Sequence, residues 1–75
     1  MTYMEMIQTI RSRSVGGCDY QESIDVFARL QRQGKITRQN IAQDDFELTA
    51  TDSDINTVLS EVKKDSNNRF NGRGF

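Results

Sequence analysis

The chain has 75 residues, of which 35% are hydrophobic and 28% are charged, and its formal net charge is −1. This composition favours one small folded domain over a disordered chain, and nucleic-acid-binding modules are usually more basic. Cys18 is the only cysteine and histidine is absent, so an internal disulfide and imidazole metal sites or bases are excluded. No segment approaches the roughly 20 apolar residues of a membrane span, and we expect a cytoplasmic protein.

The first predicted element is a helix over residues 3–11. Tyr3, Ile7 and Ile10 recur at helical spacing and would form its buried side. The pair Gly16–Gly17 then interrupts the pattern, and glycine permits backbone angles that are closed to other residues. We therefore expect the first helix to end in a tight glycine turn.

A second helix is predicted to begin after Asp19. Asp19 is a favourable N-cap, and Glu22 three residues later completes the pattern of a capping box. Tyr20, Ile24 and Phe27 lie on one apolar stripe, with Val26 and Leu30 alongside. We expect Ile24, Phe27 and Leu30 to be core first of all. Gly34 ends the helix.

The segment from residue 37 to residue 48 is predicted to form a third helix, capped by Thr37. Its apolar residues are sparse: Ile41, Phe46 and Leu48. Three acids crowd its C-terminal end, where the helix dipole disfavours them: Asp44, Asp45 and Glu47.

A fourth helix is predicted over residues 54–65, with a cap among residues 51–53. Its apolar residues follow helical spacing: Ile55, Val58, Leu59 and Val62. Residues 66–75 contain turn-forming residues and scattered aromatics, so we expect a domain over residues 1–65 and a flexible C-terminal tail.

The predicted order of a helix, a turn and a helix occurs twice, as it does in a pair of EF-hands. If Gly16 takes the sixth position of a calcium loop, Cys18 falls at the apolar eighth position and Glu22 at the twelfth. Ile55, 37 residues after Cys18, takes the eighth position of a second loop. A second register, which uses Gly34 in the first loop, is also open. Over residues 3–65 the chain resembles one lobe of calmodulin and, more closely, the single-lobe light chains of amoeboid class I myosins. The resemblance implies an all-α, four-helix EF-hand pair.

The ligand positions of both loops depart from the calcium-binding pattern. Arg11 and Arg13 stand at early positions of the first loop, where carboxylates would bind the ion. Leu48 and Ala50 take early positions of the second loop, and Leu59 replaces its glutamate. We therefore expect no calcium binding at physiological levels and no other cofactor.

The resemblance implies a calcium-independent light chain, not an enzyme, that binds and stiffens an IQ-motif helix of a class I myosin lever arm. The protein would then be associated with the actin cytoskeleton through the myosin, without direct membrane binding. The expected partner-binding residues form an apolar groove and an acidic rim for the basic helix: Met6, Phe27, Leu30, Ile41, Asp44, Asp45, Glu47, Val58 and Val62.

Two other classes stay open. Residues 30–42 are similar to the turn region of a helix-turn-helix DNA-binding protein, although the helix that follows offers Asp52, Asp54 and Glu61 instead of a basic face. A small phage-type inhibitor protein would have the same composition. An enzyme has little support, because the chain lacks a histidine base and a phosphate-binding glycine loop.

Overall fold

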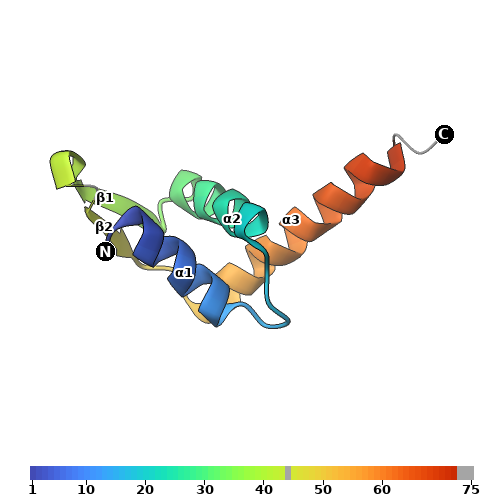
Figure 1. Cartoon of the computed structure of the whole chain (residues 1–75), viewed down its shortest axis with the longest axis horizontal. Helices are drawn as coiled ribbons and strands as arrows, with labels where there is room; N and C mark the ends of the chain where they lie inside the picture. The colour runs from blue at the N-terminus through green and yellow to red at the C-terminus, as the bar shows by residue number, and fades with distance from the viewer. Residues whose placement is uncertain (44, 73–75) are drawn as a thin grey trace.

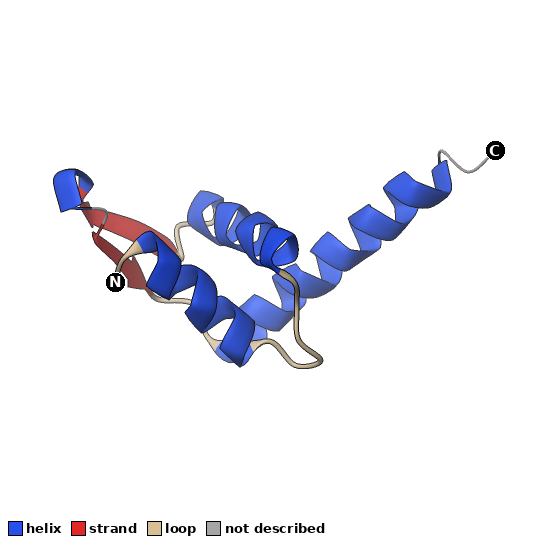
Figure 2. Cartoon of the chain, in the orientation of Figure 1, coloured by secondary structure: helices blue, strands red, loops and turns tan. Residues whose placement is uncertain are grey.

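A computed structural model describes the backbone of residues 1–43 and 45–72, and the side chains of these residues other than 41 and 67–72. The helices are α1 (Tyr3–Arg13), α2 (Tyr20–Arg32) and α3 (Asp52–Gly72). Between α2 and α3, strands β1 (Ile36–Asn40) and β2 (Asp45–Leu48) form an antiparallel hairpin with the 3₁₀ turn η1 (Ile41–Gln43) (Figures 1 and 2). The fold is therefore mixed α/β, and the predicted all-α, four-helix EF-hand pair is wrong.

The local signals around α2 are confirmed. The backbone N–H of Glu22 donates to Asp19 Oδ1 at 2.7 Å, and Glu22 Oε1 accepts from the N–H of Asp19 at 3.0 Å, so the capping box is complete. Gly16 and Gly17 both have positive φ, at 81° and 74°, as the predicted glycine turn requires. Gly34, with φ of 79°, follows the C-terminus of α2.

The predicted third helix is a β-hairpin, and the burial of its apolar residues explains the difference. Phe46 and Leu48 are two residues apart and so face the same side of a strand, whereas a helix would turn them about 200° apart. Ile36 pairs with Leu48 across the hairpin and joins them on that side. Ile36 and Phe46 are buried and Leu48 is half-buried against the core. The hairpin also removes the crowding of acids at a helix end.

The last helix begins near the predicted position. The N–H of Asp54 donates to Thr51 Oγ1 at 3.1 Å, which identifies Thr51 as the capping side chain. β2 ends at Leu48 and α3 begins at Asp52, so the second predicted calcium loop is a strand end followed by helix. α3 continues through Gly72, past the boundary predicted at residue 65, and its C-terminal half projects away from the other elements (Figure 1).

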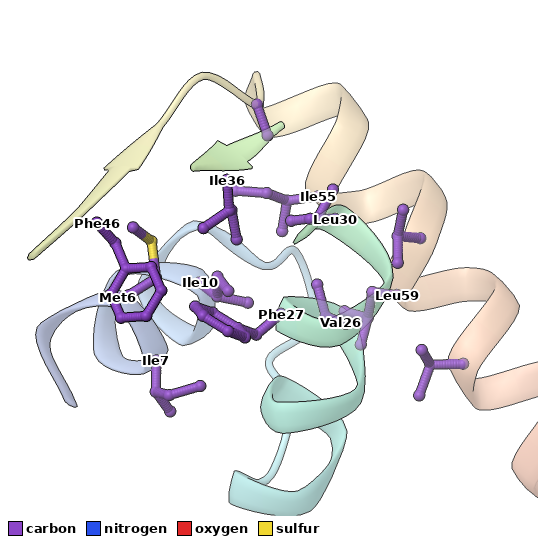
Figure 3. Close-up of a cluster of buried hydrophobic side chains, with 13 residues drawn as sticks. Met6, Ile7, Ile10, Val26, Phe27, Leu30, Ile36, Phe46, Ile55 and Leu59 are labelled. Carbon is purple, nitrogen blue, oxygen red and sulfur yellow. The ribbon is translucent and has the colours of Figure 1, made fainter. Parts of the chain in front are cut away.

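The helices α1, α2 and α3 and both strands contribute to one core (Figure 3). Its buried side chains come from α1 (Met6, Ile7, Ile10), α2 (Val26, Phe27, Leu30), the hairpin (Ile36, Phe46), the link to α3 (Ala50) and α3 (Ile55, Val58, Leu59, Val62). The ring of Phe27 lies edge-on to Tyr3 at 5.1 Å and to Phe46 at 5.2 Å between centroids. These aromatic contacts join α1, α2 and the hairpin.

Candidate docking surface

A groove lies on the surface between α2 and α3, and we call it the α2–α3 groove. Ten residues line it: Asp19, Gln21, Glu22, Asp25, Ala28, Arg29, Arg32, Val62, Asp65 and Ser66. The first seven belong to α2 and its N-cap, and the last three belong to α3. The two helices therefore form the two walls of the groove.

The wall formed by α2 is a charged stripe. Asp19, Glu22 and Asp25 follow one another at three-residue spacing, which keeps them on one side of the helix. Arg29 and Arg32 continue the stripe toward the C-terminus. The buried residues of α2 lie on the opposite side, so core packing fixes how the stripe is presented.

The wall formed by α3 is held against α2 by an ion pair. Arg29 Nη2 lies 2.6 Å from Asp65 Oδ2, and this hydrogen bond is the main cause of the raised pKa of Arg29. One turn earlier, Val62 is buried between the core and the groove. Ala28 is exposed on α2, so the groove also contains a small apolar area.

The charges of the α2–α3 groove do not cancel. Four carboxylates line it against two guanidinium groups, which leaves a formal charge of −2. The guanidinium of Arg29 is already paired with Asp65. Among the described residues no carboxylate lies within ion-pairing distance of Arg32. The excess of carboxylates in the groove therefore lies beside the N-terminal half of α2. The ammonium of Lys63 lies close to this end, since it donates to the carbonyl oxygen of Gly17 at 3.1 Å.

The structure places the apolar residues of the predicted partner site in the core. Five of them are buried: Met6, Phe27, Leu30, Val58 and Val62. Only Val62 also lines the α2–α3 groove. Ile41 begins η1, and its side chain lies outside the described part of the structure.

The two residues of the predicted acidic rim that the structure describes lie on a strand and not at a helix end. Asp45 and Glu47 belong to β2, and Asp45 Oδ1 accepts a hydrogen bond from the ammonium of Met1 at 2.7 Å. Asp44 is outside the described residues. None of the rim residues that the structure describes lines the α2–α3 groove.

The sequence interpretation missed Asp25, Arg29, Arg32 and Asp65 as candidate site residues. Three-residue spacing of the acids on α2 was a visible signal, since such spacing marks one side of a helix. Nothing local in the sequence indicated that α3 would pass beside that stripe. The contact joins residues 36 positions apart.

The glycine turn is the other surface feature that several side chains hold in place. Asn56 Oδ1 accepts from the N–H of Val15 at 2.7 Å, and Lys63 Nζ donates to the carbonyl oxygen of Gly17 at 3.1 Å. Val15 is 81% exposed, and Cys18 is half-buried with its sulfur 3.6 Å from Ser14 Oγ. A more open hollow beside this turn is lined by Gln8, Arg11, Ser12, Gly17 and Cys18, with Arg11 as its charged side chain.

Within the described ranges, no group of three or more His, Cys, Asp or Glu side chains could hold a metal ion. None of the helices, over that same part of the chain, has both the length and the apolar character needed to cross a membrane. Comparison with protein-family models, curated proteins and solved structures finds no match. The function is therefore inferred from the chemistry of the groove.

Proposed function

We propose that this protein is an interaction module that binds a basic amphipathic helix of a partner protein in the α2–α3 groove. The observation that carries the proposal is the excess of carboxylates between two helices that the core and the Arg29–Asp65 pair hold in place. Charge complementarity of this kind speeds association and selects among partners.

The two helical walls of the groove favour a helix as the bound element. Its two apolar lining residues are Ala28, which is exposed, and Val62, which is 3% exposed, so a third helix would have a small apolar contact there. Lysine and arginine side chains of that helix would lie over the groove with their alkyl chains and reach the carboxylates with their charged ends. Binding is the proposed role, and no catalytic role is proposed for these residues.

An IQ-motif helix of a class I myosin is a basic amphipathic helix, and we keep it as one candidate partner. A calcium-independent light chain in a lever arm would then be the biological role. The support for this candidate is now the charge of the groove alone, because the EF-hand pair that first suggested it is absent from the fold.

Duplex DNA is a less suitable partner for this surface. In the helix-turn-helix alternative, residues 30–42 would be a turn between two helices, but that segment forms the end of α2, strand β1 and the start of η1. α1, a turn and α2 do succeed one another, but the N-terminal half of α2 carries Asp19, Glu22 and Asp25. Carboxylates on the docking side of a helix repel phosphates.

The proposal is tested by titrating the isotopically labelled protein with a designed lysine-rich amphipathic peptide and following the backbone amides. Asp25→Asn removes one carboxylate of the groove, and Asp25 makes no hydrogen bond or ion pair within the described part of the chain. We expect this variant to bind about two- to fivefold more weakly, with a shallower dependence on salt. Glu47→Gln is the matched control, because it removes one exposed carboxylate on β2.

Saturable shifts confined to α2 and residues 61–66, weakened by Asp25→Asn and unchanged by Glu47→Gln, would support the groove. Equal weakening by both variants would mean that the peptide responds only to net charge. Specific binding of a DNA duplex, with steep salt dependence and shifts in α2, would favour the helix-turn-helix class instead.

A further inference from the structure

The charges of the α2–α3 groove are ordered along its length. The three carboxylates of α2 occupy residues 19–25, and the guanidinium of Arg32 stands at the other end. From residue 19 to residue 32 the stripe spans about 20 Å at the rise of an α-helix. Arg29, between the two ends, is compensated by Asp65 at 2.6 Å. A bound segment therefore meets a negative region first and a positive charge about three turns later.

A helix lying in this groove would be oriented by that order of charges. Its basic residues would be most stable beside Glu22 and Asp25, and an acidic residue would be most stable beside Arg32. In an ordinary helix, acidic residues favour the N-terminal turn and basic residues favour the C-terminal turn, because each complements the helix dipole. A partner with this usual distribution matches the groove only when its C-terminal end lies beside the N-terminal end of α2.

The backbone dipoles favour the same arrangement. In an antiparallel pair, the partially negative C-terminus of the bound helix lies next to the partially positive N-terminus of α2. Side-chain charges and backbone dipoles thus act in the same direction, although each contribution at a surface is modest and is screened by salt.

We infer that the α2–α3 groove selects a helix that is acidic at its N-terminal end and basic toward its C-terminal end, and binds it antiparallel to α2. This inference rests on the proposed function and adds the charge order and the direction of the partner. It differs from general attraction of a basic peptide, which would set no direction.

The direction is measured with a designed amphipathic peptide that has glutamates in its first turn and lysines along its C-terminal half. A nitroxide spin label is attached to one end of the peptide or to the other, and paramagnetic broadening of the protein amides is recorded. We expect a label on the C-terminus to broaden Gln21, near the start of α2, and a label on the N-terminus to broaden Gly34, just beyond its end. The reverse pattern, or equal broadening of both amides by each label, would overturn the inferred direction while the groove remains the binding site.

Two controls separate the charge order from other causes. A peptide of the same composition with lysines and glutamates evenly spread should bind the groove. With this peptide, each label should broaden the amides of Gln21 and Gly34 to nearly the same extent. Arg32→Gln alters an exposed side chain. With the peptide that has glutamates first and lysines last, this variant should show a smaller difference in broadening between the two label positions. If both controls keep the full difference in broadening between the two label positions, the charge order does not set the direction of binding. Absence of any saturable binding by either peptide would instead overturn the proposed function itself.

Discussion

Arg29 and Asp65 are joined by a hydrogen-bonded ion pair, with Arg29 Nη2 2.6 Å from Asp65 Oδ2, one turn beyond Val62, the last buried apolar residue that the structure describes in α3. The pair connects α2 to the region where α3 begins to project from the body (Figure 1). Removal of the pair should therefore affect the α3 wall of the groove more than the stability of the whole fold.

Asp65→Asn tests that expectation. Both side chains are partly exposed, so the free energy of unfolding should change by no more than about 1 kcal/mol. Hydrogen exchange of the amides at residues 63–66 should become faster, because this turn loses its contact with α2. Asp52→Asn is the control, since it breaks the exposed Arg13–Asp52 pair at the other end of α3. Unchanged exchange at residues 63–66 in Asp65→Asn would show that the pair does not hold the wall.

Asn56→Ala should destabilise the glycine turn. The Asn56 amide accepts a hydrogen bond from the N–H of Val15 at 2.7 Å and donates to the carbonyl oxygens of Arg13 and Asp52 at 3.3 and 2.8 Å. Loss of these bonds should reduce the free energy of unfolding by about 1–3 kcal/mol in urea denaturation. Thr57→Ala, at an exposed neighbouring position, should stay within about 0.5 kcal/mol. Equal effects of the two variants would contradict the role of Asn56.

Protonation of Asp54 should contribute to the fall in the free energy of unfolding at low pH. The ammonium of Lys35, at 2.9 Å, followed by a hydrogen bond from the N–H of Thr51, lowers the pKa of Asp54 from 3.8 to about 2. A lowered folded-state pKa means that this stabilisation is complete above pH 3.8 and is lost as the pH falls through about 2. The titration of the Asp54 side-chain carbon, followed by NMR, should show the low value.

Lys35→Gln is the matched test of the cause. Without the ammonium, the pKa of Asp54 should move upward toward 3.8, while the bond from Thr51 keeps part of the shift. In the variant the acid loss of stability from Asp54 should still begin near pH 3.8, but it should be smaller and should end at a higher pH than in the parent protein. An identical titration of Asp54 in both proteins would show that Lys35 does not cause the shift.

Phe46→Ala tests whether the hairpin belongs to the core. The ring of Phe46 is buried against Phe27, and the guanidinium of Arg38 lies 5.0 Å above it. Truncation should cost about 3–5 kcal/mol, as for other buried phenylalanines. Gln39→Ala, exposed on β1, is the control and should be nearly neutral. A nearly neutral Phe46→Ala would be consistent with a surface hairpin and would contradict this core.

Local sequence signals determined the elements that depend on neighbouring residues. The capping box of Asp19 and Glu22 set the start of α2, and the pair Gly16–Gly17 set the turn before it. Helical spacing of apolar residues predicted most of the buried sides of α1, α2 and the first half of α3, but Tyr20 is exposed and Tyr3 and Ile24 are only half-buried. Each of these signals works within a few residues, so it did not require knowledge of the rest of the fold.

Only the tertiary structure decided the state of residues 36–48 and the position of the groove. Ile36 and Leu48 become one buried pair only when the chain reverses and the rest of the core covers their side of the hairpin. The carboxylate stripe on α2 becomes one wall of a groove only because α3 passes beside it and Asp65 reaches Arg29. Burial and ion pairing between distant residues depend on the whole packed chain, and local propensity does not contain that information.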